Sequence, residues 1–214
     1  MAEKNKTNYV KGNAIFLYDA LHQETCADFV GDIAELIMSK PYRQPQTQNI
    51  ANLETPYDIS GHGVIDVFID SPGGDVSQKN TILTFLNIAR SKGIIIRTTV
   101  TGTAASCASL IAIQGTPGFR VMYQEAYNMI HYGRSVTAAT AEGEAEKSFK
   151  TIKERHKYIV DTYKKFTDLT DKEIAACMKS EANYFSAKKC LEKNMCDWVL
   201  TDVGTYIKRE NKQR

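Results

Sequence analysis

A serine, a histidine and a pair of glycines stand in settings suited to acyl-transfer chemistry. Ser106 lies where an extended, β-branched stretch ends and an apolar run begins, and His131 closes a short apolar segment. Gly73 and Gly74 form a turn directly after another apolar segment. A serine hydroxyl becomes a nucleophile when a neighbouring base takes its proton, and main-chain N–H groups stabilise the oxyanion that follows. Together these residues predict hydrolysis of an acyl bond.

Each of these features also has a purely structural interpretation. Ser106 could cap a helix, Pro-Gly-Gly is an ordinary turn, and a histidine after an apolar strand is most often structural. The catalytic interpretation gains from their combination, because a helix beginning at Ser106 would point the Cys107 amide at an oxyanion. The missing side chains of Gly73 and Gly74 would let a substrate backbone come close, with the Gly74 amide as second donor. Cys107 is also an alternative thiol nucleophile.

The periodicity of the remaining sequence predicts the elements that hold these residues. Buried-type strands at 64–69 and 94–100 flank a helical pattern at 76–92, which predicts a parallel, right-handed strand–helix–strand unit. Further helices are expected at 25–40, 106–113, 137–166, 171–178 and 187–193, and further strands at 14–18, 127–131 and 198–200. Strands that alternate with helices place the chain in the α/β class.

Composition shifts divide the chain into a domain and its flanks. Residues 1–13 are expected to be a flexible arm and 204–214 a basic tail, leaving 14–203 as a single domain. Residues 41–63 contain three prolines among polar residues and are expected to form a long irregular loop.

Charge and cysteine content exclude several classes of protein. Lys and Arg number 27 against 25 Asp and Glu, so no overall field attracts nucleic acid. The five cysteines form no CxxC pair, so neither a disulfide framework nor a zinc site is predicted, and no metal or cofactor is expected. No stretch approaches the ~20 apolar residues of a membrane helix. We expect a cytoplasmic protein with reduced thiols and no membrane or nucleic-acid partner.

In this order, the motifs resemble those of the ClpP family of serine peptidases, within the larger ClpP/crotonase fold. The family's Ser-Pro-Gly-Gly turn, its Gly-x-Ala-Ala-Ser nucleophile motif and its Met-Ile-His segment correspond to Ser71–Gly74, Gly102–Ser106 and Met129–His131. Its protruding handle helix resembles 137–166, and its closing pattern resembles Tyr184–Asp197. The resemblance implies a fold of repeated βαβ units, with 41–63 as an insertion.

The resemblance also implies a role for each site residue. Ser106 would be the nucleophile, His131 the general base and then acid, and the amides of Gly74 and Cys107 the oxyanion hole. Polypeptide substrate would bind as an added strand, touching Gly73, Tyr132 and Gly133. Family members stack two rings through their handle helices, and an AAA+ unfoldase can supply their substrate. The surface-helix interpretation of 137–166 stays open.

The match fails at the family's catalytic aspartate, where this chain has Ala182. The neighbours Glu181 and Asn183 are candidates to orient His131 instead, because carboxylates and amides both accept the imidazole N–H. We expect an active serine endopeptidase with an unusual third member. The alternatives are a weak or inactive ring subunit or scaffold and, more remotely, a crotonase-type enzyme acting on acyl-CoA. The departures, including Asn194 for an expected glycine, are typical of phage- or plasmid-encoded relatives such as capsid maturation proteases, which would work with phage assembly proteins in the host cytoplasm.

Overall fold

Strands alternate with helices along the part of the chain that the computed structural model describes, residues 10–39, 53–59, 63–132, 144–179 and 182–210. In chain order the elements are β1 (Val10–Lys11), β2 (Ala14–Leu17), α1 (Gln23–Ser39), β3 (Val64–Ser71), α2 (Val76–Ser91), β4 (Ile95–Ala105), α3 (Cys107–Ala112), β5 (Arg120–Tyr123), β6 (Tyr127–Ile130), α4 (Glu144–Phe166), α5 (Asp171–Cys177), β7 (Asn183–Ser186), α6 (Ala187–Glu192), β8 (Trp198–Leu200) and β9 (Tyr206–Lys208). The predicted α/β class is confirmed.

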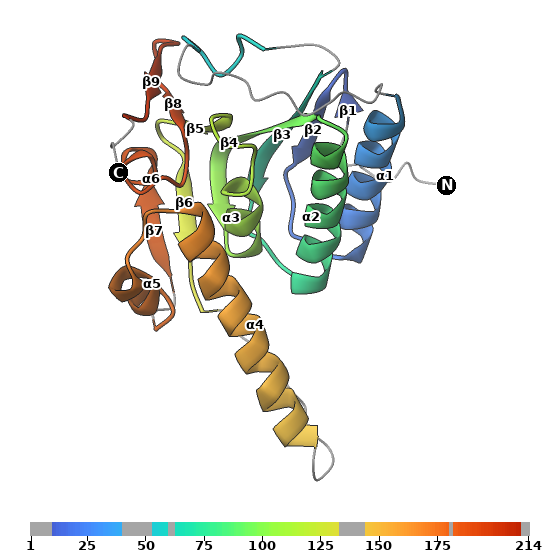
Figure 1. The fold of residues 1–214 in the computed structure, drawn as a ribbon, viewed down its shortest axis with the longest axis vertical. Helices are drawn as coiled ribbons and strands as arrows, with labels where there is room; N and C mark the ends of the chain where they lie inside the picture. Colours follow the sequence, from blue (N-terminus) through green and yellow to red (C-terminus); the bar gives the residue numbers. More distant parts are fainter. Residues whose placement is uncertain (1–9, 40–52, 60–62, 133–143, 180–181, 211–214) are drawn as a thin grey trace.

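The strands form one sheet whose main order is β1-β2-β3-β4-β5-β8-β9, with β6 and β7 attached at the end of β4 (Figure 1). Strands β2, β3, β4, β5 and β8 run parallel, and β1 and β9 close the edges antiparallel. The middle of β4 pairs with β5, but its last three residues pair with β6. Because parallel strands end at the same edge, the turns that follow β3 and β4 lie side by side.

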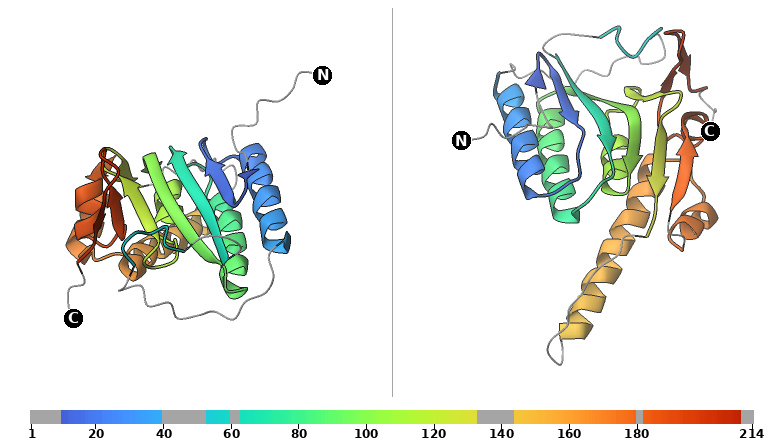
Figure 2. Two further views of the ribbon diagram at one scale, coloured as in Figure 1. Left: turned by 90° about the horizontal axis from the view of Figure 1, so that it is seen from above. Right: turned by 180° about the vertical axis from the view of Figure 1, so that it is seen from behind.

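Helices α1, α2 and α3 cover one face of this sheet (Figure 2). The buried side of α1 is the one that its spacing predicts, formed by Cys26, Phe29, Ile33, Leu36 and Ile37. Helix α3 is buried along its whole length, as its continuous apolar sequence predicts. The apolar side chains between sheet and helices form one core cluster. The long helix α4 is held at its C-terminal end by the buried Tyr163 and extends away from the body (Figure 1).

Two segments expected to lack regular structure contain edge strands. Strand β1 falls inside the predicted arm 1–13 and pairs with Ala14 and Ile15. Strand β9 falls inside the predicted tail 204–214 and pairs with β8. Both strands are only two or three residues long, so their own sequences give little sign of pairing. Residues 1–9 of the arm and 211–214 of the tail lie outside the described residues.

The described part of the predicted 41–63 loop is fastened to the sheet by a buried arginine. Arg97 in β4 pairs with Asp66 in β3 and donates to the carbonyls of Pro56 (2.7 Å) and Ile59 (3.0 Å). Its guanidinium also lies 4.0 Å from the centre of the Tyr57 ring. A buried charge of this kind needs a full set of partners, and here the loop supplies several of them.

Candidate active site

Ser106 sits on a sharp turn between β4 and α3. Its backbone has φ +55° and ψ −118°, a region that residues with a side chain rarely adopt, and its N–H donates to Met129 O at 2.8 Å. Although it occupies the cap position of α3, its side chain makes no capping hydrogen bond. The cap interpretation of Ser106 is therefore wrong, and the strained turn frees its hydroxyl for another partner.

That partner is His131. Strand β6 runs parallel to the end of β4, with Ala105 opposite Met129, so the residue after β6 reaches the turn after β4. The His131 Nε2 lies 2.7 Å from the Ser106 Oγ, and both side chains are half-buried. This is the separation that a general base needs to take a hydroxyl proton. The sequence-predicted pair is brought together in the arrangement that acyl transfer requires.

The glycine turn packs closely against the turn that carries the nucleophile. Gly73 has φ +84°, and a Cβ built on it would lie 2.8 Å from both the Cys107 N and the Ser106 Cβ, and closer still to the Ala105 carbonyl oxygen. A Cβ on Gly74 would meet the Leu21 carbonyl oxygen at 2.5 Å. In the direction of the missing Cβ atoms the protein's own chain fills the space, and contact of a substrate backbone with Gly73 stays a prediction.

The two predicted oxyanion donors lie beside this turn. The Cys107 N–H belongs to the first residue of α3 and so has no acceptor within the helix. The Gly74 N–H lies near the Cys107 sulfur, which at most is a weak acceptor. Burial raises the pKa of the Cys107 thiol. A buried, protonated thiol is a poor nucleophile, which argues against the alternative in which Cys107 attacks.

A buried polar network that was not predicted from the sequence holds β6 in place. Ser109 in α3 donates to the Asn128 side-chain oxygen at 2.6 Å and lies 2.9 Å from the Tyr163 hydroxyl. These three residues come from α3, β6 and α4, and all are almost fully buried. Burial raises the pKa of Tyr163, so its hydroxyl stays protonated. The network fixes the strand that carries His131, and local sequence does not reveal it because its members are far apart along the chain.

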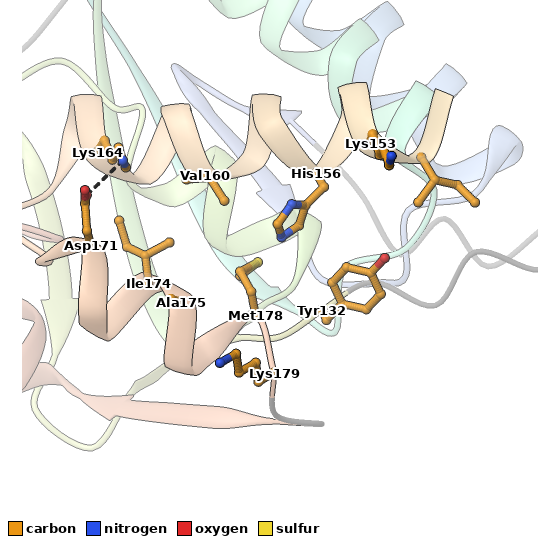
Figure 3. A pocket seen from close by; sticks show the side chains of 11 residues that line it. Tyr132, Lys153, His156, Val160, Lys164, Asp171, Ile174, Ala175, Met178 and Lys179 are labelled. Carbon is orange, nitrogen blue, oxygen red and sulfur yellow. Dashed lines mark ion pairs between the residues drawn. The ribbon is translucent and has the colours of Figure 1, made fainter. Parts of the chain in front are cut away.

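Tyr132, predicted to contact substrate, lies at the edge of a cavity of about 520 Å³ between α4 and α5 (Figure 3). Its ring makes an edge contact with His156, with centroids 5.5 Å apart. Apolar side chains such as Val160 and Ile174 line the cavity, and the ion pair of Lys164 with Asp171 (2.8 Å) spans the two helices. One residue that lines the cavity, Tyr132, therefore directly follows His131 in the chain. Gly133, the other predicted contact, lies outside the described residues.

A model of the Clp protease family matches residues 46–203. The chain belongs to the Clp protease family. The resemblance is confirmed, and with it the ClpP/crotonase fold, whose parallel strands and helices are those of Figure 1.

Curated relatives agree with this family. The chain is 34% identical over 141 residues to the ATP-dependent Clp protease proteolytic subunit 1 of Shouchella clausii, covering 64% of this chain and 68% of that one. It is 29% identical over 137 residues to the ATP-dependent Clp protease proteolytic subunit of Mesostigma viride, covering 64% and 58%. The chain thus spans less than two thirds of the length of some relatives that it matches.

The third member of a Clp protease triad is not supplied by Asn183. Its amide nitrogen donates to the carbonyls of Ile130 and Cys177, each at 3.2 Å, which directs the side chain toward α5. Within the described residues, Ser106 is the hydrogen-bond partner of His131, and none reaches the Nδ1. The other candidate, Glu181, lies outside those residues.

The register of β6 and β7 nonetheless shows where the family's aspartate would lie relative to His131. Strands β6 and β7 are antiparallel, with Ile130 opposite Asn183. Continuing this register by one residue sets Ala182 opposite His131, where paired Cβ atoms are about 4.5–5.5 Å apart. A carboxylate at 182 would therefore reach the imidazole, and the methyl group of alanine cannot accept its proton.

Other features bear on cofactors and location. Among the described residues, no three His, Cys, Asp or Glu side chains are grouped in a way that could hold a metal ion. In the same part of the chain, no helix is long and apolar enough to cross a membrane.

Proposed function

We propose that this Clp protease family member is a serine endopeptidase that cleaves polypeptides through an acyl-enzyme on Ser106. The observation that carries the proposal is the 2.7 Å approach of the His131 Nε2 to the Ser106 Oγ at a strained turn beside two main-chain amides. For Nε2 to accept the hydroxyl proton, the Nδ1 must carry the other proton.

The reaction follows from the positions of these groups. Ser106 Oγ attacks the peptide carbonyl while His131 takes its proton, and the amides of Gly74 and Cys107 donate to the oxyanion. An oxyanion is a far stronger acceptor than a thiol sulfur, so the Gly74 N–H donates to it in preference to the nearby Cys107 sulfur. The C–N bond then breaks as His131 protonates the departing amine. Water, deprotonated by His131, hydrolyses the ester and restores the serine.

The assembly and supply of substrate belong to the same proposal. The relatives are named as proteolytic subunits of ATP-dependent proteases, which favours ring assembly through the protruding α4 and delivery of unfolded chains by an AAA+ unfoldase. In a phage setting, assembly proteins of the particle would be the substrates. Both settings place the protein in the cytoplasm.

A second candidate function is a catalytically weak or silent ring subunit, favoured by Ala182 at the aspartate position. Loss of the orienting carboxylate slows a serine triad severely, but the oxyanion hole and substrate binding leave residual catalysis. We favour the active enzyme because the Ser106 Oγ lies 2.7 Å from the His131 Nε2, within reach for proton transfer.

Covalent labelling distinguishes the two candidates. The protein, Ser106→Ala and Ala182→Asp would be treated with a fluorophosphonate, and adducts would be detected by intact mass. The proposal expects an adduct on the unaltered protein, none on Ser106→Ala, and faster labelling of Ala182→Asp. An adduct on Ala182→Asp alone would favour the silent subunit. Absence of labelling in all three would overturn the assignment of Ser106 as nucleophile.

A further inference from the structure

One buried cation lacks the partners that the others have. Lys79, in the second turn of α2, has 0% of its surface exposed, and within the described residues its Nζ has no hydrogen-bond partner. The buried Arg97 and Arg120, by contrast, are paired with Asp66 and Asp197. Burying an ammonium without a counter-charge is strongly unfavourable. A negatively charged group from another molecule would therefore stabilise Lys79.

The nearest carboxylate along the helix is already used. Asp75 lies one turn before Lys79 and caps α2, accepting hydrogen bonds from the N–H groups of Ser77 and Gln78. Burial lowers the pKa of the Lys79 ammonium, and no carboxylate of the described residues offsets this effect. The helix itself therefore leaves the amine without an ionic partner.

Lys79 lies in α2, and α2 packs against α3, which begins at the residue after Ser106. The Lys79 Nζ and the Cys107 sulfur are close enough to influence each other's pKa, and the same sulfur lies near the Gly74 N–H. Cys107 follows Ser106 in the chain, so the amine stands beside the oxyanion donors. When the carbonyl of a substrate residue points at these donors, the side chain of the same residue branches from the adjacent Cα and lies near the Lys79 amine.

The cover over the amine is an aromatic side chain that faces solvent. The Nζ of Lys79 lies 4.4 Å from the centre of the Tyr158 ring. Tyr158 belongs to α4 and is itself 46% exposed. Such a cation–π contact is weaker than a charge-assisted hydrogen bond between the ammonium and a carboxylate in the same place. A bound acidic side chain can therefore take the place of the ring.

Building on the proposed function, we propose that Lys79 is a specificity residue that binds the carboxylate of an Asp or Glu side chain on the residue whose carbonyl Ser106 attacks. The protein then cleaves after acidic residues. Ammonium and carboxylate each supply the counter-charge that the other lacks, and the pair forms only when such a substrate is bound.

The test measures binding apart from catalysis. Two fluorescent octapeptides, acetylated and amidated, would differ only in one central residue, Glu or Gln. Their affinities for Ser106→Ala would be compared by fluorescence anisotropy with those for Ser106→Ala/Lys79→Met. The control is Ser106→Ala/Lys172→Met, which removes an exposed lysine of α5. We expect an approximately tenfold preference for the Glu peptide, lost with Lys79→Met and kept with Lys172→Met.

Each outcome decides one question. A preference for the Glu peptide that disappears only with Lys79→Met supports the specificity role. This holds even if fluorophosphonate fails to label the unaltered protein and the proposed hydrolysis is thereby refuted. Equal affinity for the two peptides, no binding of either, or a preference that survives Lys79→Met would overturn the role of Lys79. Labelling of Ser106 in that case would leave the peptidase proposal intact.

Discussion

Replacing Gly73 by alanine tests whether the turn after β3 positions the nucleophile. The added methyl would lie 2.8 Å from the Ser106 Cβ and the Cys107 N, and closer to the Ala105 carbonyl oxygen. Two of these three atoms are main-chain atoms that cannot swing aside like the end of a flexible side chain. The turn after β4 must therefore shift, and it carries both the Ser106 hydroxyl and the Cys107 amide.

The magnitude has a backbone part and a contact part. Placing an L-residue at the Gly73 φ of +84° costs about 1–2 kcal/mol in the free energy of unfolding, and relieving the contacts adds about 1–3 kcal/mol. Gly204→Ala is a matched control, because Gly204 has a similar φ of +79° and nothing within 4 Å of the added methyl. It should show the backbone part alone.

The chemistry should respond more sharply than the stability. Loss of one oxyanion donor lowers the rate about 10²–10³-fold, and a displacement of about 1 Å costs about 10²-fold. We expect Gly73→Ala to slow fluorophosphonate labelling of Ser106 by about 10² or more, with Gly204→Ala labelled at the unaltered rate. Stability would be measured by urea unfolding and labelling by timed intact mass. Equal labelling rates for the two variants would refute the role assigned to the Gly73 turn.

Three further perturbations test other parts of the structure. Lys79→Met should raise the free energy of unfolding by about 1–3 kcal/mol in urea, because it removes a buried ammonium without a partner; a decrease would contradict that account. Asp197→Ala should lower it by about 3–5 kcal/mol, since Arg120 would be left buried and unpaired, and a loss below about 1 kcal/mol would mean that the pair is not buried in solution. A hydrogen bond from Lys193, and others from Thr170, lower the pKa of Glu173 from 4.5 to about 2. The stability from this carboxylate is then present above about pH 4.5 and lost as the pH falls toward 2, so Glu173→Gln should show a smaller fall across that range in thermal melts.

The sequence allowed the Ser106–His131 pair and most helices to be predicted, because both follow from local pattern. An amphipathic helix such as α1 and a buried strand such as β3 show their periodicity within a single window of sequence. Strand β5 escaped prediction because its buried Arg120 is tolerated only through Asp197, far along the chain. Such long-range compensation has no local signal.

The glycine turn shows the same limit in the active site. Its sequence indicated that backbone atoms come close, which the structure bears out, but not whose backbone it is. The Gly73 Cα faces residues 105–107 of the protein's own chain. Glycine at this position allows the two turns to pack closely. Only the pairing of β3 with β4 determines that these turns meet.

The absence of an aspartate at 182 need not disturb the distance between base and nucleophile. Strand β6 is held by the Ser106 N–H on the Met129 carbonyl, by Asn128 in its buried network and by Asn183 on the Ile130 carbonyl. These contacts fix the backbone that carries the imidazole without any contribution from its Nδ1. A carboxylate there would chiefly stabilise the charged imidazolium and its correct tautomer. Ala182→Asp should therefore change the labelling rate of Ser106 and leave the free energy of unfolding nearly unchanged. A large gain in stability would instead mean that β6 depends on this missing contact for its position.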